Sequence, residues 1–312
     1  MWRTISKQWF LILLAICLGI GFSLPEPLSF VANSAFIRNG ILFVVMVLMG
    51  WTLQPQSIVR SIRQPVPSLI AILINIAVVP LLAWPVIWFL PEDLAGGLIV
   101  ASLVPCTLAS ASVWTRSAGG DDSIAMVTTV VTNLACFLVA PIGISLMLQR
   151  TVGIDLGSQM QGLFLMVVAP LCLGQGLRLI GLAAWADKRK WALSIIAQTG
   201  ILAMVLLGSV ISAERLSSGQ AISMGDIALT AMCAWVIHLI AVGIGYYLSA
   251  MAGAQRPQQL GTAIACGQKT LMVGLQLALD GGVSVLPMIL YHVGQLLIDT
   301  MLVRWWTRDR SQ

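Results

Sequence analysis

Lys269 is the residue whose type and position call most clearly for a chemical role. It lies within the segment Cys266-Gly267-Gln268-Lys269-Thr270, in the middle of a long apolar stretch. If that stretch crosses a membrane, an ammonium at its centre costs roughly 2.5 to 3.5 kcal/mol, and it lies too deep to reach the aqueous interface. Lys269 is therefore expected to face a wet cavity or a partner group, where it can attract an anion or release a proton.

Asp299 is a second ionisable residue deep in an apolar stretch, and with Lys269 it is a candidate coupling group. It can pair with a cation such as Lys269 or Arg304, bond a neighbouring helix end, or rest in its protonated form. His238 and His292 stand alone in apolar segments. Each is expected to satisfy one internal hydrogen bond rather than to relay protons.

Polar side chains also surround a proline in the stretch LIVASLVPCTLASASVWTR. Pro105 removes a backbone donor and clashes with the preceding turn, so the helix is predicted to break around residues 104–106, with Cys106 at the break. Gly267 and its polar neighbours predict a similar break later in the chain. Ser110 and Ser112 follow the first break closely enough to line it.

The next apolar stretch carries four oxygen-bearing side chains with helical spacing. Thr128, Thr129, Thr132 and Asn133 fall on one face, so they can look towards the broken helix, although threonines can also bond back to their own turn. Asn75, five residues before Pro80, is a further buried amide that needs partners. The candidate ligands for substrate or ion are Asn75, Ser110, Ser112, Thr128, Thr129, Thr132, Asn133, Gln268, Lys269 and Thr270.

The composition shows what kind of protein positions these groups. Of 312 residues, 58% are hydrophobic and 9% are charged, and the mean hydropathy is +0.94. This excludes a soluble domain and predicts an all-α protein that crosses the lipid bilayer many times. The six cysteines lie in apolar segments without metal-binding spacing, so neither a disulfide framework nor a zinc site is expected. The predicted spans are residues 8–24, 37–54, 67–90, 95–115, 122–148, 161–182, 191–212, 225–249, 258–279 and 285–306.

The basic residues test this count of ten through the positive-inside rule. With both termini in the cytoplasm, the outer side holds only Arg38, Arg150 and Arg215. The inner side holds Arg3, Lys7, Arg60, Arg63, Arg116, Arg178, Lys188, Arg189, Lys190, Arg256, Arg304, Arg308 and Arg310. A miscount in the middle of the chain would scramble this segregation, so the sequence predicts N-in, C-in topology. The basic clusters are topological and do not indicate a nucleic-acid partner.

Ten spans divide into two repeats of five, residues 1–150 and 151–312, with the join in the polar stretch 149–161. A repeat with an odd number of spans inserts upside down relative to its copy. The two predicted breaks then fall in the fourth and ninth spans, at the same position in each repeat. Matched breaks of this kind predict a midplane binding site in a transporter that works by alternating access.

Three segments resemble the bile acid:sodium symporter family, in particular the branch that holds its seventh mammalian member and bacterial relatives. They are PCTLASASVWTRSAGGDDSIAMVTTVVTN (105–133), CGQKT (266–270) and LPMILYHVGQLL (286–297). The resemblance implies ten helices in panel and core subdomains, with crossed, unwound fourth and ninth helices. It also implies sodium ligands at Asn75, Ser110, Thr128 and Gln268. The family's Ser-Asn pair reads Ser110-Ala111 here and its glutamate reads Ile264, which places sodium coupling in doubt.

The leading interpretation is a carrier of a small anionic or amphipathic solute, coupled to sodium or protons, or with Lys269 in place of a bound cation. It needs no other cofactor. The alternatives are an arsenite-type carrier using the soft thiol of Cys106 and a membrane regulator without flux. An intramembrane enzyme is not expected, because no nucleophile stands beside a base. The compact loops and the resemblance favour a bacterial inner membrane. The sequence does not indicate an oligomeric state.

Overall fold

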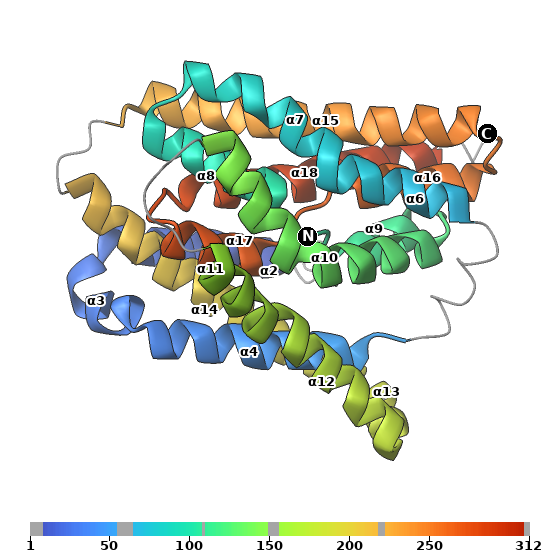
Figure 1. The fold of residues 1–312 in the computed structure, drawn as a ribbon, viewed down its shortest axis with the longest axis horizontal. Coiled ribbons are helices and arrows are strands. Elements are labelled where there is room, and N and C mark those ends of the chain that lie inside the picture. The colour runs from blue at the N-terminus through green and yellow to red at the C-terminus, as the bar shows by residue number, and fades with distance from the viewer. Residues whose placement is uncertain (1–8, 55–64, 108–109, 149–155, 218–221, 309–312) are drawn as a thin grey trace.

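The protein is a bundle of helices (Figure 1). The computed structural model describes residues 9–54, 65–107, 110–148, 156–217 and 222–308, and every regular element within these ranges is helical. The predicted all-α class is therefore confirmed for the described residues. The helices are α2 (Trp9–Ser23), α3 (Pro25–Asn33), α4 (Ala35–Thr52), α6 (Pro65–Leu73), η1 (Ile74–Val78), α7 (Val79–Ala83), η2 (Trp84–Phe89), α8 (Glu92–Leu103), α9 (Ser110–Ser117), α10 (Asp122–Leu148), α11 (Leu156–Leu163), η3 (Phe164–Val168), α12 (Ala169–Leu177), η4 (Arg178–Leu182), α13 (Ala183–Lys188), α14 (Lys190–Ser217), α15 (Met224–Met251), α16 (Arg256–Gly267), α17 (Leu271–Asp280) and α18 (Leu286–Arg308).

Among the described residues, 7 helices are long and apolar enough to cross a membrane, or up to 8 when the bent pair α2 and α3 counts as one span. They are 35–52, 65–89, 122–148, 156–188, 190–215, 224–251 and 286–308. The bend between α2 and α3 is 103°. A multi-pass membrane protein is thereby confirmed, and these helices overlap eight of the predicted spans.

The other two predicted spans, 95–115 and 258–279, coincide with pairs of shorter helices. The pairs are α8 with α9 (12 and 8 residues) and α16 with α17 (12 and 10 residues). None of these four is long enough to cross a bilayer alone, since a crossing takes roughly 20 helical residues. Ten spans, the inverted repeats and the orientation stay predictions. The boundary at 150/151 and Arg3, Lys7, Arg60, Arg63, Arg150 and Arg310 lie outside the described residues.

The first break has a local cause in the sequence. Helix α8 ends at Leu103, and Val104 has extended backbone angles (φ −68°, ψ 155°). A residue before proline is pushed away from helical angles, so Pro105 sets this conformation. The predicted break around residues 104–106 is confirmed.

The second break contains no proline. Helix α16 ends at Gly267, Gln268 and Thr270 are extended, and α17 begins at Leu271. The predicted interruption here is also confirmed. Since no local signal enforces extended backbone, contacts from other helices must hold it.

The helices pack in two groups. The first contains α2, α3, α4, α12 and α14, with α14 against α2, α3 and α4, and α4 against α12. The second contains α6 to α10 and α15 to α18, with α15 against α16 and α18, and α16 against α6 and α10. In Figure 1, α4 and α12 lie along the lower side and α7 and α15 along the upper side. Both breaks belong to the second group.

Candidate functional site

The two breaks meet directly. The backbone N–H of Thr270 donates to the carbonyl oxygen of Pro105 at 2.9 Å. One interrupted segment therefore passes against the other, as crossed discontinuous helices do. The helix ends left by each break, with their unpaired carbonyl groups, are gathered at this crossing.

The ammonium of Lys269 occupies the crossing. Its side chain is 0% exposed. Nζ donates to the backbone oxygen of Asn75 at 2.6 Å, to Oδ1 of Asn75 at 3.2 Å and to the backbone oxygen of Val104 at 3.0 Å. Three oxygens around one positive charge resemble the shell that a metal cation would take. The sequence predicts a wet cavity or a partner group around Lys269. In the structure its partners are these three oxygens, none of which belongs to a carboxylate.

The backbone oxygen of Asn75 is available because the helix around it is irregular. Residues Ile74–Val78 form a π-helical turn, η1, and the N–H of Val79 bonds to Ile74 instead of Asn75. The next residue, Pro80, has no N–H to offer. The carbonyl of Asn75 therefore lacks a helical partner and accepts the ammonium.

Asn75 also holds the end of α16. Its Nδ2 donates to the backbone oxygens of Cys266 at 3.1 Å and Gln268 at 3.0 Å, and more weakly to Ala265 at 3.4 Å. The last carbonyls of a helix carry partial negative charge and need donors when they are buried. Asn75 thus donates to the end of α16 through its side-chain amide, while its backbone oxygen and its Oδ1 accept hydrogen bonds from Lys269.

Helix α10 caps the first break, as the spacing of its polar residues predicts. Asn133 Nδ2 donates to the oxygen of Cys106 at 2.9 Å, and Thr129 Oγ1 donates to the oxygen of Thr107 at 2.8 Å. Thr132 Oγ1 accepts from the N–H of Cys106 at 3.1 Å. These three residues lie on the face of α10 that meets the first break, although Thr132 also bonds back to its own turn.

Thr128 lies on the same helix but is placed differently. Its Oγ1 is buried and makes no hydrogen bond in the described part of the chain. The four residues expected to bind sodium therefore do not share one set of partners. Asn75 holds Lys269, Ser110 and Gln268 bond each other, and Thr128 is left unpaired.

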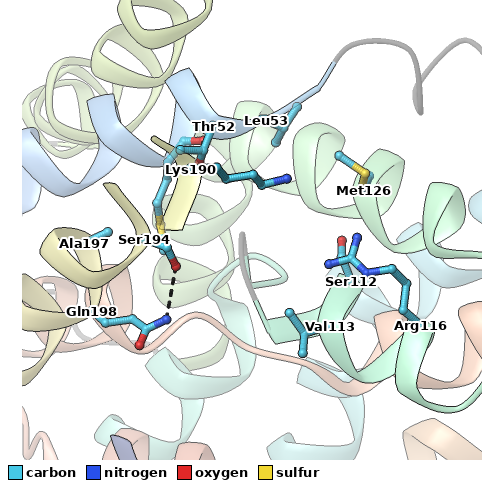
Figure 2. Close-up of a pocket in the computed structure, with 11 residues that line it drawn as sticks. Thr52, Leu53, Ser112, Val113, Arg116, Met126, Lys190, Ser194, Ala197 and Gln198 are labelled. Atoms are coloured by element: carbon cyan, nitrogen blue, oxygen red, sulfur yellow. Dashed lines mark hydrogen bonds between the residues drawn. The ribbon is translucent and has the colours of Figure 1, made fainter. Parts of the chain in front are cut away.

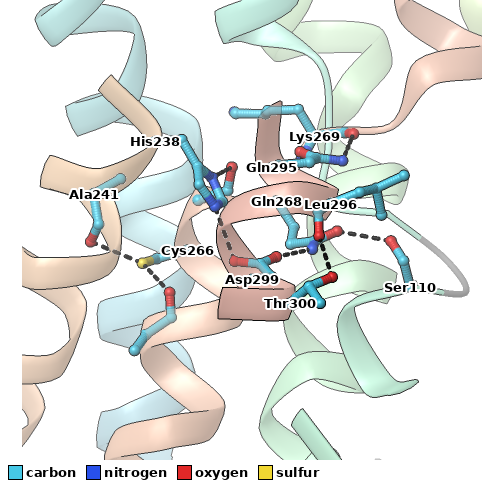
Figure 3. A network of polar contacts seen from close by, with 12 residues as sticks. Ser110, His238, Ala241, Cys266, Gln268, Lys269, Gln295, Leu296, Asp299 and Thr300 are labelled. Atoms are coloured by element: carbon cyan, nitrogen blue, oxygen red, sulfur yellow. Dashed lines mark hydrogen bonds and ion pairs between the residues drawn. The ribbon is translucent and has the colours of Figure 1, made fainter. Parts of the chain in front are cut away.

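A chain of buried polar groups continues from Gln268 (Figure 3). Ser110 Oγ donates to Gln268 Oε1 at 2.7 Å, and Gln268 Nε2 donates to Asp299 Oδ2. The other carboxyl oxygen of Asp299 lies 2.9 Å from Nε2 of His238. In turn, Nδ1 of His238 lies 3.0 Å from the oxygen of Gly267. From the sequence, the possible partners of Asp299 are Lys269, Arg304, a helix end or a bound proton. In the structure, Asp299 contacts His238 and Gln268.

His238 is the residue that sequence reasoning undervalued. It was expected to make one internal bond, but it makes two and joins Asp299 to the end of α16. Gly267 makes room for its ring, since a Cβ on Gly267 would lie 2.7 Å from Nδ1 of His238. No local motif marks His238. Its partners could not be read from the sequence because they lie on other helices.

Helix α18 supplies two further residues that sequence reasoning missed. Gln295 accepts the N–H of Lys269 at 2.8 Å and donates to its carbonyl at 3.0 Å, which holds the second break extended. Gln295 also donates to Nδ1 of His292, the one bond expected of that histidine. Tyr291 donates to the oxygen of Gly267 at 2.9 Å. Positions 291, 292, 295 and 299 form one helical face, a signal that was present in the sequence.

A pocket lies between the two helix groups (Figure 2). Arg116 and Ser112 of α9 line it on one side, and Lys190 and Gln198 of α14 line it on the other. Arg116 also pairs with Asp122 at 2.7 Å. Ser112 therefore faces this pocket, whereas Ser110 on the same helix faces Gln268. In the described residues, no group of three or more His, Cys, Asp or Glu side chains could hold a metal ion.

Comparison with known proteins decides the family. The SBF-like CPA transporter family matches residues 8–308. The chain belongs to this family. This SBF-like protein is therefore a multi-pass membrane transporter, in a family of transporters rather than enzymes, and the resemblance to the bile acid:sodium symporters is confirmed.

Relatives of this SBF-like transporter come from plants, bacteria and mammals. It is 24% identical to the "Probable sodium/metabolite cotransporter BASS4, chloroplastic" of Oryza sativa subsp. indica, over 96% of this chain and 75% of the relative. It is 25% identical to the "Uncharacterized sodium-dependent transporter YocS" of Bacillus subtilis, over 97% and 92%. It is 20% identical to the rat "Sodium/bile acid cotransporter 7", over 96% and 92%. All three names include sodium, and one of them names a metabolite and another a bile acid as the substrate.

Proposed function

We propose that this protein is a secondary active transporter of a small organic anion, in which the ammonium of Lys269 takes the place of a bound cation. The observation that carries this proposal is the shell of three oxygens around Nζ, from Asn75 and Val104. A cation at this point offsets the partial negative charge at the end of α8 and stabilises the crossing. Lys269 supplies that charge from within the chain.

The names of its relatives include sodium, so the bonding of the residues expected to bind sodium bears on this proposal. Oδ1 of Asn75 accepts from Lys269, and the hydroxyl of Ser110 is directed to Gln268. The resemblance also expects an asparagine at Ala111 and a glutamate at Ile264, and both are apolar here. These features support a crossing that works without a bound sodium ion.

The proposed topology has ten crossings in two inverted repeats, 1–150 and 151–312, with both termini in the cytoplasm of a bacterial cell. The pattern of caps supports it. In each half, the break in the fourth span is held by the span that follows: α10 supplies Thr129 and Asn133, and α18 supplies Gln295. Equivalent roles at equivalent positions are what an inverted repeat requires.

The pocket supports an anionic substrate. Arg116 and Lys190 place positive charge on opposite sides of it, next to the hydroxyl of Ser112. It lies between the two helix groups, so a relative movement of the groups would change its access. Such movement is the basis of alternating access.

Exchange of labelled taurocholate and labelled succinate across proteoliposomes tests the proposal, since one anion is amphipathic and the other is not. We expect wild-type protein to exchange at least one of them. Lys269→Gln should abolish the exchange, because a neutral amide cannot offset the helix-end charge. Full exchange by Lys269→Gln would refute the role of the ammonium. Failure of the wild type on both probes would count against an organic anion, and would leave the arsenite-type carrier and the non-transporting regulator as the alternatives.

A further inference from the structure

The turn between α13 and α14 carries a run of basic residues, 188–190. It follows the apolar helical segment 156–188, which has 33 residues. Since a bilayer crossing takes roughly 20 helical residues, the last part of this segment extends to the membrane interface. In Figure 1, α13 lies at the lower right, beyond the end of α12. Lys190 lines the pocket described above, whereas Arg189 has a different neighbour.

The chain bends between α12 and α13. Ile180 and Gly181 leave helical backbone angles, and the φ of Gly181 is 97°, a left-handed value that glycine adopts without a steric penalty. At this bend the side chains of Leu179 and Ile180 are 87% and 73% exposed. In a membrane protein, aliphatic side chains that the protein leaves uncovered at this depth contact the acyl chains of lipids.

Helix α13 is fixed against the end of α4. Nη1 of Arg178 donates to the backbone oxygen of Trp51 at 2.9 Å, and its two Nη atoms lie 3.0 Å from the two carboxylate oxygens of Asp187. The ring of Trp185 stacks on the ring of Trp51, with 4.9 Å between the centroids and 11° between the planes. The position of Trp185 is therefore set by two contacts with α4, and the charge of Asp187 is compensated by Arg178.

The guanidinium of Arg189 lies over this fixed ring. Its Cζ is 4.6 Å from the centre of the Trp185 ring. A cation over an indole face is attracted by the ring, which holds the planar group in place and leaves its N–H edge open. The carboxylate in the same turn, Asp187, is already paired with Arg178, and no carboxylate among the described residues pairs with Arg189. The open edge can donate two parallel hydrogen bonds to a phosphate group.

We propose that Arg189, Trp185, Leu179 and Ile180 form the binding site for one anionic phospholipid. The guanidinium of Arg189 binds the phosphate, and Trp185 holds that guanidinium at the level of the head groups, where tryptophans of membrane proteins concentrate. The acyl chains of the same lipid pass along Leu179 and Ile180. The site lies apart from the transport proposal, because none of these four residues lines the pocket.

Charge and shape together select this kind of ligand. A zwitterionic lipid carries an ammonium beside its phosphate, which the basic run 188–190 repels, whereas the net negative charge of an anionic lipid is attracted. A free phosphate ion would meet the guanidinium of Arg189 but would leave Leu179 and Ile180 uncovered. An anionic phospholipid satisfies the charged and the aliphatic parts of the site with one molecule.

Native mass spectrometry of the full-length protein, in detergent with equimolar dioleoyl phosphatidylglycerol and dioleoyl phosphatidylcholine, counts the lipids that stay bound. We expect wild-type protein to retain phosphatidylglycerol preferentially. Arg189→Gln should retain it about fivefold less, which corresponds to about 1 kcal/mol for one basic residue near anionic lipid. Arg256→Gln is the matched control, since Arg256 is exposed and begins α16 in the second helix group. No preference in the wild type, or an equal loss in both variants, would overturn the proposal.

Thermal unfolding in nanodiscs separates a lipid from a free anion. Wild-type protein should unfold at a higher temperature in discs that contain phosphatidylglycerol than in discs of phosphatidylcholine alone, and Arg189→Gln should reduce this difference. Trp185→Leu keeps the charge of Arg189 but removes the ring beneath it, so it should reduce the difference as well. Inorganic phosphate added to discs of phosphatidylcholine should leave the unfolding temperature unchanged. Stabilisation by phosphate equal to that by phosphatidylglycerol, or an unchanged difference in Arg189→Gln, would overturn the lipid site.

Discussion

The ammonium of Lys269 lies 2.6 Å from the backbone oxygen of Asn75, although 194 residues separate them along the chain. The π-helical turn and Pro80 free this oxygen, and the break after Gly267 brings the lysine to it. Asn75 also holds the end of α16 through its amide. These two residues therefore fasten the second break to the third predicted span.

Replacing Asn75 by alanine should destabilise the protein by about 1–3 kcal/mol, because buried carbonyls of α16 lose their donor. Thermal unfolding in detergent measures the effect. Asn39→Ala is a matched control, since Asn39 accepts a single part-buried bond from Gln276. An equal loss of stability in both variants would contradict a special role for Asn75.

Replacing Gly267 by alanine should disturb His238, because the new Cβ would lie 2.7 Å from Nδ1. We expect the ring 15N signals of His238 to shift in the NMR spectrum of histidine-labelled protein at fixed pH, because the ring must move away from the new methyl group. Gly243→Ala on α15 is the control, because nothing lies within 4 Å of its new Cβ. Unaltered ring signals of His238 in Gly267→Ala would show that this close contact is unimportant.

The breaks themselves could be predicted from the sequence. Pro105 acts on its own neighbours, so the signal for the first break is local. A lysine deep in an apolar stretch must find partners, which marks the place of the second break but not the contacts that hold its backbone extended. The polar face of α10 follows from helical spacing, and Thr129, Thr132 and Asn133 lie where it expects them.

The partners across the crossing could not be predicted in the same way. Asp299 meets His238 because α15 and α18 pack together, and 61 residues separate the two in the chain. Periodicity gives the face of a helix but not the helix that it touches. The accepting role of Asn75 depends on a backbone carbonyl, which no side-chain pattern reveals.

Removing one charge from the pocket should weaken anion binding. Arg116→Gln and Lys190→Gln should each raise the apparent Kd about three- to tenfold, since an exposed charge contributes roughly 1 kcal/mol at contact distance. Competition by unlabelled anion in the exchange assay gives this number. Lys188→Gln is the control, because Lys188 ends α13 and does not line the pocket. Equal weakening by Lys188→Gln would mean that only general surface charge matters.

The thermal stability of purified protein in sodium chloride and in choline chloride, at equal ionic strength, tests the central role of Lys269 most directly. Wild-type protein should unfold at the same temperature in both salts. Lys269→Ala vacates the three oxygens, so it should be stabilised by sodium specifically, by about 2.7 kcal/mol at a concentration one hundred times the Kd. A sodium-specific stabilisation of the wild type would contradict the account, because the ammonium would then not stand in place of the ion.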